Sequence, residues 1–246
     1  MHPALFFADS GFFQLPLLRA EASKRLRALP LLSRAASGDR AAAIALHTGF
    51  WPFVREFEGV IDQQQLPRAP LAARFPDLPP RGLRSAIVGL AASVAEMKAE
   101  EGSHALHWRK DAWALDVELR DEAAVPAIGE LLARARTKDL PEFFAVLAGT
   151  EIVAEELSAF LVGSTAFTGL FSRQRWIWGE IHLATHDGPS HLEIDLDLAR
   201  AYSPSCSEAR LRVTSEILST IDLFERAVHE TEATSTDRFD TTLQAA

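Results

Sequence analysis

The chain has 246 residues, of which 48% are hydrophobic, and its formal net charge is -9. This length suits one large domain with a single core, and the hydrophobic content is ordinary for a globular protein. The acidic balance, with no basic block, argues against a nucleic-acid partner because a polyanion would be repelled. A single cysteine, Cys206, excludes an internal disulfide and any multi-thiolate metal site within one chain.

The first 18 residues, MHPALFFADSGFFQLPLL, are apolar in patches, but they lack a basic region and are interrupted by Asp9 and Pro16. This pattern is unlike a signal peptide. No apolar run approaches the roughly 20 residues that are needed to cross a bilayer. We therefore expect a cytoplasmic protein with no membrane partner.

Hydrophobic spacing predicts helices along the whole chain, and no period-two strand pattern stands out. The expected helices cover residues 19–36 with a break at Pro30, 39–65 with a kink or new start at Pro52, 85–115, 122–136, 139–162, 173–201 with an interruption at Gly188-Pro189, and 207–230. A proline-rich connection at 66–82 and a turn at 164–169 join them, while 1–18 and 231–246 are expected to be irregular or frayed. The fold class is therefore all-α, with 1–246 as one domain.

The helix at 85–115 carries an apolar stripe with two polar residues in it. The stripe comprises Ile87, Leu90, Val94, Met97, Trp108 and Leu115. Glu101 and His104 occupy its missing positions. An unpaired carboxylate in a low-dielectric interior costs several kcal/mol, so this pair needs a partner, and a metal ion is the obvious candidate. A competing pair, Glu100 and His107, aligns with the polar residues of the helix and is expected on its solvated face.

Two further segments repeat this pattern. Glu151 interrupts the stripe of the helix at 139–162, with Glu155 and Glu156 lying progressively further round. A third cluster consists of His182, His186, Asp187 and His191. On an unbroken helix this cluster forms two i,i+4 pairs on different faces, and a kink at Gly188-Pro189 would swing one pair toward the other.

These groups together indicate a metal site built from nitrogen and oxygen ligands, which suits iron or manganese as well as zinc. Carboxylates from several helices with an E-x-x-H element are typical of dinuclear carboxylate sites, with Glu101 or Glu151 as the simplest bridge. Each element taken alone is more often a buried ion pair or a satisfied core histidine. The combination on three helices favours the metal site.

The motifs resemble those of the haem-oxygenase-like non-haem diiron oxidases and oxygenases, which are close in shape to TenA and PqqC proteins, and the nearest likeness is to the alkene-forming medium-chain fatty-acid decarboxylases. The resemblance rests on the aromatic-proline segment at 50–54, on Glu101-x-x-His104 followed by Trp108, on Glu151 with the segment 156–159, and on the His/Asp cluster. It implies a bundle of about seven helices and metal ligands at Glu101, His104, Glu151, His182, Asp187 and His191.

One part of the motif departs from the family pattern. The family has H-x3-D-x2-H, whereas this chain has H-x4-D-x3-H, or His186 where the aspartate should stand. A rival register pairs His191 with Asp195 and preserves H-x3-D, but it places Leu198 at the last histidine.

The resemblance also implies an activity. Glu101 and Glu151 would act through the metal, which would be two irons, with manganese as an alternative, and O2 would be a co-substrate. The substrate would be a small carboxylic or amino acid, such as a fatty acid, that undergoes oxidative decarboxylation, N-oxygenation or C–C or C–N cleavage in biosynthesis. An external electron donor fits this chemistry, and a homodimer is expected from base rates alone.

Two alternatives remain open. One is a metal-free enzyme of the TenA or PqqC type, in which the polar groups act as acid and base; the position of Cys206 outside the inward stripes argues against a cysteine-nucleophile version. The other is a non-catalytic helical protein with a structural metal such as zinc.

Overall fold

The computed structural model describes residues 13–67, 79–121, 123–184, 190–204 and 206–244, and all regular elements in these ranges are helices. They are α1 (Leu15–Ala28), α2 (Pro30–Ala36), α3 (Arg40–Asp62), α5 (Pro80–Ala114), α6 (Pro126–Ala135), α7 (Leu140–Val162), α8 (Thr165–Thr168), the 3-10 helix η1 (Ser172–Gln174), α9 (Ile177–Leu183), α10 (His191–Tyr202) and α11 (Ser207–Gln244). Among the described helices, seven have ten residues or more: α1, α3, α5, α6, α7, α10 and α11. The predicted all-α bundle is confirmed.

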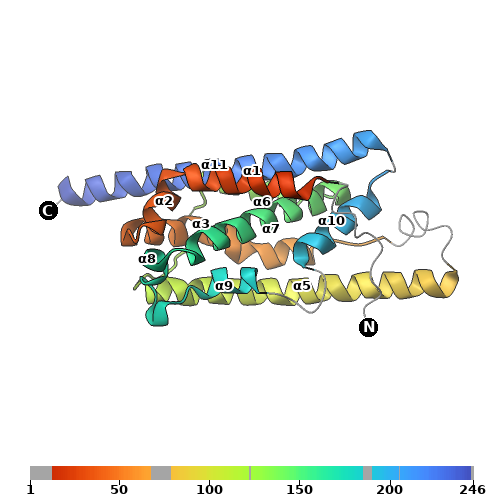
Figure 1. Ribbon diagram of the computed structural model, residues 1–246, viewed down its shortest axis with the longest axis horizontal. Coiled ribbons are helices and arrows are strands. Elements are labelled where there is room, and N and C mark those ends of the chain that lie inside the picture. The colour runs from red at the N-terminus through yellow and green to blue at the C-terminus, as the bar shows by residue number, and fades with distance from the viewer. Residues whose placement is uncertain (1–12, 68–78, 122, 185–189, 205, 245–246) are drawn as a thin grey trace.

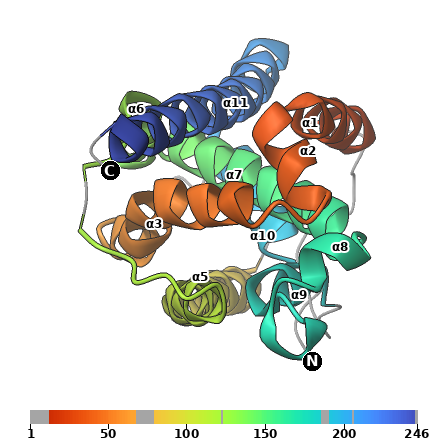
Figure 2. The ribbon, with the colours of Figure 1, turned by 90° about the vertical axis from the view of Figure 1, so that its left-hand side faces the viewer.

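The long helices run side by side along one axis of the molecule (Figure 1). Viewed along that axis, α7 lies in the middle, with α1, α6 and α11 on one side and α5 and α9 on the other (Figure 2). Helix α7 packs against α1, α9, α10 and α11, and it is buried over most of its length. A polar side chain on α7 therefore faces protein from almost any direction.

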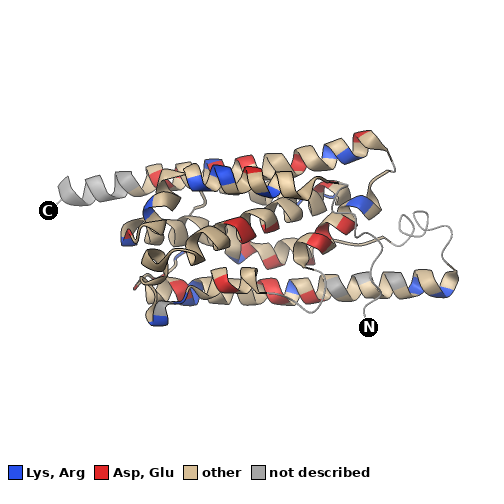
Figure 3. Cartoon of the chain, viewed as in Figure 1, with Lys and Arg blue, Asp and Glu red and all other residues tan. Residues whose placement is uncertain are grey.

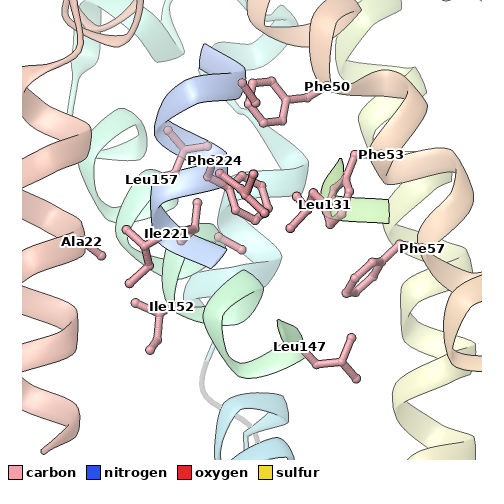
Figure 4. Close-up of a cluster of buried hydrophobic side chains, with 14 of the residues drawn as sticks. Ala22, Phe50, Phe53, Phe57, Leu131, Leu147, Ile152, Leu157, Ile221 and Phe224 are labelled. Carbon is pink, nitrogen blue, oxygen red and sulfur yellow. The ribbon is translucent and has the colours of Figure 1, made fainter. Parts of the chain in front are cut away.

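Aromatic and aliphatic side chains fill the space between α3, α7 and α11 (Figure 4). Phe224 of α11 stacks on Phe50 with ring centroids 6.0 Å apart and meets the edge of Phe53 at 5.3 Å. Gly149 of α7 lets α11 approach, because a Cβ atom at this position would lie 2.7 Å from the Cβ of Thr220. This core holds α7 at a fixed rotation, which matters for Glu151 two residues later.

Residues of both charges are spread along the helices (Figure 3). Several form ion pairs between helices, such as Arg134 with Glu216 at 2.7 Å and Arg136 with Glu56 at 2.8 Å. Exposed pairs of this kind contribute little individually, typically below about 1 kcal/mol, so the fold depends chiefly on its apolar core.

Prolines and capping residues determine where the helices begin more than hydrophobic spacing does. Helix α6 begins at Pro126 instead of residue 122, and α5 begins at Pro80 instead of residue 85, because proline suits the first turn of a helix. The predicted start of α7 is confirmed, since the side chain of Asp139 accepts a hydrogen bond from the N–H of Glu142 at 3.1 Å. Pro52 lies inside α3 without ending it.

The first helix begins earlier, and the last helix ends later, than predicted. Helix α1 begins at Leu15, with a proline in its first turn, and α11 continues to Gln244, beyond the expected end at Glu230. Residues 231–244 contain no glycine or proline, and extending an existing helix is far easier than starting one. The turn predicted at 164–169 contains the short helix α8. None of the described helices is long and apolar enough to span a membrane.

Candidate metal centre

Helix α5 points the two unusual residues of its stripe inward. Met97, Glu101 and Trp108 are all buried, as the spacing predicted. The Nδ1 atom of His104 lies 3.0 Å from Oε2 of Glu101, so the E-x-x-H pair is hydrogen-bonded within one turn. The other oxygen of Glu101, Oε1, is buried and has no hydrogen-bond partner among the described residues. One of the two oxygens of this buried carboxylate is therefore available to a further ligand.

Glu151 reaches the same place from α7. Its side chain is buried, while those of Glu155 and Glu156 are only partly so, which confirms Glu151 as the inward carboxylate of this helix. Burial raises the pKa of Glu151, and the nearby charge of Glu101 raises it further. Two carboxylates therefore face each other in a region where each disfavours the ionisation of the other.

Hydrogen bonds between α5 and α9 fix the position of His182. The carboxylate of Asp111 on α5 accepts hydrogen bonds from the N–H groups of Ile177 and Trp178, at 3.2 and 2.8 Å, and so caps the first turn of α9. One turn later, Nδ1 of His182 donates to the carbonyl of Trp178 at 2.7 Å, and the two rings lie 3.9 Å apart between centroids. This hydrogen bond leaves Nε2 of His182 as the available lone pair.

His191 is the first residue of α10. Ser190 and Glu193 form a capping box, in which Ser190 Oγ accepts from the N–H of Glu193 at 3.2 Å and the Glu193 carboxylate accepts from the N–H of Ser190 at 2.9 Å. This cap sets where the helix starts. It places Nδ1 of His191 3.5 Å from Oε1 of Glu101 and 3.8 Å from Oε1 of Glu151.

Asp195 lies one turn further along α10. Its side chain is 0% exposed, and neither carboxylate oxygen has a hydrogen-bond partner among the described residues. Burial raises its pKa well above the ordinary value, and the charges of Glu151 and Glu101 add to this, while His191 opposes it. The carboxyl group therefore belongs electrostatically to the same cluster.

The histidines divide into charged and neutral ones. Burial opposes protonation of His191, but the carboxylates of Glu101 and Glu151 beside its Nδ1 atom outweigh burial and raise its pKa to about 11. Burial likewise raises the pKa of Glu101, but the hydrogen bond with His104 and the nearby imidazole of His191 lower it to about 2. His182, in contrast, has its pKa lowered to about 3 by burial and by the charge of His104. Without a metal, protons on the histidines balance the charge of the carboxylates.

A cavity of about 240 Å³ opens beside this cluster. Its lining comprises Glu100, Ser103, His104, Glu151, Glu155, Ile181, His182, Ala184, Ser190 and His191, with no lysine or arginine among the described lining residues. Glu155 pairs with Arg19, which approaches from α1. A small molecule in this cavity would contact the histidines and carboxylates directly.

The arrangement suits a metal cation. One ligand atom each from Glu101, Glu151 and His191 lies within 4.8 Å of the others. Metal–ligand bonds of about 2.1 Å place neighbouring ligand atoms roughly 3.0–3.4 Å apart, so only a small closure is needed. A dication would also neutralise the buried Oε1 atom of Glu101, which has no hydrogen-bond partner among the described residues and otherwise carries a desolvation penalty.

Most of the predicted site residues come together. Glu101, His104, Glu151, His182 and His191 meet from α5, α7, α9 and α10, while His186 and Asp187 lie outside the described residues. The prediction for Glu100 was right about its exposure but missed its contact with the site: the side chain is 38% exposed, yet it lines the cavity, and its Oε2 lies 2.5 Å from Nε2 of His191.

Asp111 was not among the predicted site residues, and Asp195 was predicted only in the rival register. The capping-box pattern Ser190-x-x-Glu193 would have shown where α10 starts and which of its faces is inward.

Comparison with known proteins supports the fold. No protein-family model and no curated protein sequence matches the chain. Among solved structures, the crystal structure of a TenA homologue from Pseudomonas syringae pv. tomato is similar, with a TM-score of 0.65 and 15% sequence identity. The match covers 89% of this chain and 91% of that one. The chain therefore has a TenA-like helical fold.

Proposed function

We propose that this protein is an O2-dependent non-haem iron oxidase or oxygenase that acts on a small carboxylic or amino acid. The observation that carries the proposal is the convergence of the buried carboxylates Glu101 and Glu151 with histidines from three helices. The buried carboxyl group of Asp195 lies within reach of their charges. Among the described residues no lysine or arginine lines the adjoining cavity to neutralise them. Dinuclear carboxylate sites in helical bundles use this composition of ligands.

The residues that would hold the metal are Glu101, His104, Glu151, His182, His191 and Asp195, and we expect them to bind up to two ions. His191 and Asp195 preserve the H-x3-D spacing, and Leu198, which is buried, stands where the related proteins have a further histidine. We therefore expect the second ion to have fewer protein ligands and to bind more weakly. Bound iron would supply the electrons that activate O2, and an external donor would restore them.

The protein side of the chemistry is to orient the substrate and to exclude water. A cavity of about 240 Å³ is at the small end of ligand sites, which favours a compact substrate. The ring of Trp178, which contacts His182, lines together with Trp108 a second cavity of about 50 Å³ whose walls are almost entirely apolar. Water gains little by entering such a space, so this side of the site stays dry.

Anaerobic titration with Fe(II), followed by exposure to O2, tests the proposal. We expect up to two Fe(II) per chain, oxygen consumption and a transient visible absorption band. Glu101→Ala and His104→Ala should abolish tight binding, whereas Glu96→Ala, on the exposed face of α5, should not. The proposal fails if neither Fe(II) nor Mn(II) binds, or if the site variants bind as the wild type does.

A second candidate is a metal-free enzyme of the TenA or PqqC type, and the TenA-like fold favours it. In this case Glu101 and His104 would exchange protons with an organic substrate. Cys206 is exposed and is absent from the described cavity lining, so a cysteine nucleophile is not supported. Turnover that persists with a chelator would favour this candidate, and tightly held zinc without oxygen consumption would favour a structural metal.

A further inference from the structure

We infer that Glu100 is a positioning residue for His191: its carboxylate accepts a hydrogen bond from Nε2–H of the imidazole and so turns Nδ1, the nitrogen that would bind a metal, toward Glu101 and Glu151. The inference rests on the proposed metal site and assigns a role to a residue outside its ligand set. It depends on a short contact, on the helical geometry of α5 and on the chemistry of imidazole.

The two nitrogens of the His191 ring face two consecutive residues of α5. Oε2 of Glu100 lies 2.5 Å from Nε2, while Oε1 of Glu101 lies 3.5 Å from Nδ1. Consecutive residues on an α-helix point about 100° apart. Glu101 therefore points into the core, Glu100 points to the rim of the cavity, and the imidazole of His191 lies between the two carboxylates.

Imidazole binds a metal through one nitrogen only, and the other nitrogen then carries the proton. Whichever nitrogen donates a hydrogen bond to a fixed acceptor is the one that is protonated, and this decides which nitrogen is free for the metal. Because Glu100 accepts at Nε2, Nε2 keeps its proton, and Nδ1 is the nitrogen that gives up its proton when a metal binds. It also opposes rotation of the ring out of the site.

Glu100 is suited to this role because it stays at the edge of the site. Its side chain is 38% exposed, whereas that of Glu101 is 6% exposed. Its backbone is held in α5, and its carbonyl accepts a hydrogen bond from Ser103 Oγ at 2.7 Å. Replacing a partly exposed side chain should leave the fold intact while releasing the ring of His191.

Metal binding to three variants of the full chain tests the inference. We would titrate wild type, Glu100→Ala, Glu100→Gln and Glu96→Ala with Co(II) and, anaerobically, with Fe(II). Glu100→Ala should weaken binding about 10- to 100-fold, the usual effect of removing such a partner. Glu100→Gln should recover most of this loss because its amide oxygen still accepts from Nε2–H. Glu96→Ala, one turn away on the same helix, should match wild type.

A second measurement reports the tautomer directly. In the zinc-loaded protein, which is diamagnetic, 15N–1H correlation spectra should show His191 protonated at Nε2 in wild type and in Glu100→Gln. The Glu100→Ala protein should show a loss or mixture of this state, with unchanged helical content by circular dichroism.

The outcomes separate this inference from the proposed function. If wild type binds no metal, the proposed site itself fails. If wild type binds but Glu100→Ala binds equally well, or if Glu100→Gln is as weak as Glu100→Ala, only the role of Glu100 is overturned. Equal losses in Glu100→Ala and Glu96→Ala would indicate a general effect of charge on α5, and would also overturn it.

Discussion

Replacing Asp195 with asparagine should separate the requirements of folding from those of metal binding. The carboxyl group is 0% exposed and lacks hydrogen-bond partners among the described residues. Asparagine has nearly the same shape but cannot ionise. The substitution therefore removes the charge of this residue and leaves the packing of α10 nearly unchanged.

In the metal-free protein the substitution should be stabilising. Burial raises the pKa of Asp195 well above its usual value, so the folded state keeps a proton that the unfolded chain releases at a pH of about 4. The folded state then binds more protons, and its stability falls as pH rises. The slope is about 1.4 kcal/mol per pH unit until the native carboxyl ionises. Asp195→Asn removes this penalty, so its advantage over wild type should widen with pH.

In the metal-loaded protein the same substitution should be damaging. Removing one partner of a buried charge pair costs about 3–5 kcal/mol, which corresponds to roughly a hundredfold to several-thousandfold loss of metal affinity. The assays are urea unfolding with a chelator at pH 6, 7 and 8, and calorimetric titration with Mn(II) or anaerobic Fe(II). Asp197→Asn, two residues along α10, is the control for metal affinity and should bind as wild type does.

Two results would refute this reasoning. Wild-type affinity in Asp195→Asn would show that Asp195 is not a ligand. A loss of stability in the metal-free variant at pH 8 would show instead that the carboxylate makes a structural interaction that asparagine cannot replace.

The remaining predictions concern His191, Asp111 and Gly149. Metal affinity should rise with pH, because His191 holds a proton with a pKa of about 11 that a metal must displace; calorimetry in buffers of different ionisation enthalpy measures the protons released. The ion pairs of His191 should stabilise the metal-free protein fully below a pH of about 6.5, and this contribution should disappear as pH rises toward 11, which unfolding at several pH values will show. Asp111→Ala should lower the free energy of unfolding by about 1–2 kcal/mol, and it should weaken metal binding because it releases the helix that carries His182. Asp111→Asn should retain much of the cap. Thermal unfolding and metal titration of the two variants check these effects. Gly149→Ala should lower stability by about 1–3 kcal/mol in urea, because its Cβ would lie 2.7 Å from that of Thr220.

The inward residues of α5 and α7 were predictable because each helix has a regular apolar stripe with a polar interruption. The same signal exists on α10, where Leu192, Asp195, Leu196 and Ala199 form one buried face. It was missed because 173–201 was treated as one interrupted helix, so no helical register was assigned to the part after Ser190. The capping box at Ser190 supplies this register, and with it Asp195 becomes as conspicuous as Glu101.

The roles of Glu100 and Asp111 were not predictable in this way. Both residues act across a junction between α5 and a helix that follows it by more than sixty residues: Glu100 on His191 and Asp111 on the first turn of α9. Periodicity within α5 places Glu100 among polar residues and gives no information about which helix packs beside them. Such contacts depend on how helices distant in sequence pack together, and only the folded structure shows this.

The charge balance of the site decides more about function than the fold does. A TenA-like bundle at 15% identity is compatible with both a metal enzyme and a metal-free one, since one scaffold supports several chemistries. The two differ in what neutralises the carboxylates. A metal-free enzyme must hold protons on Asp195 and His191, so its stability falls as pH rises, whereas a dication replaces those protons and removes the dependence. If the slope of stability against pH flattens when Fe(II) or Mn(II) is added, the cluster is a metal site; if the slope is unchanged, its groups serve as acids and bases.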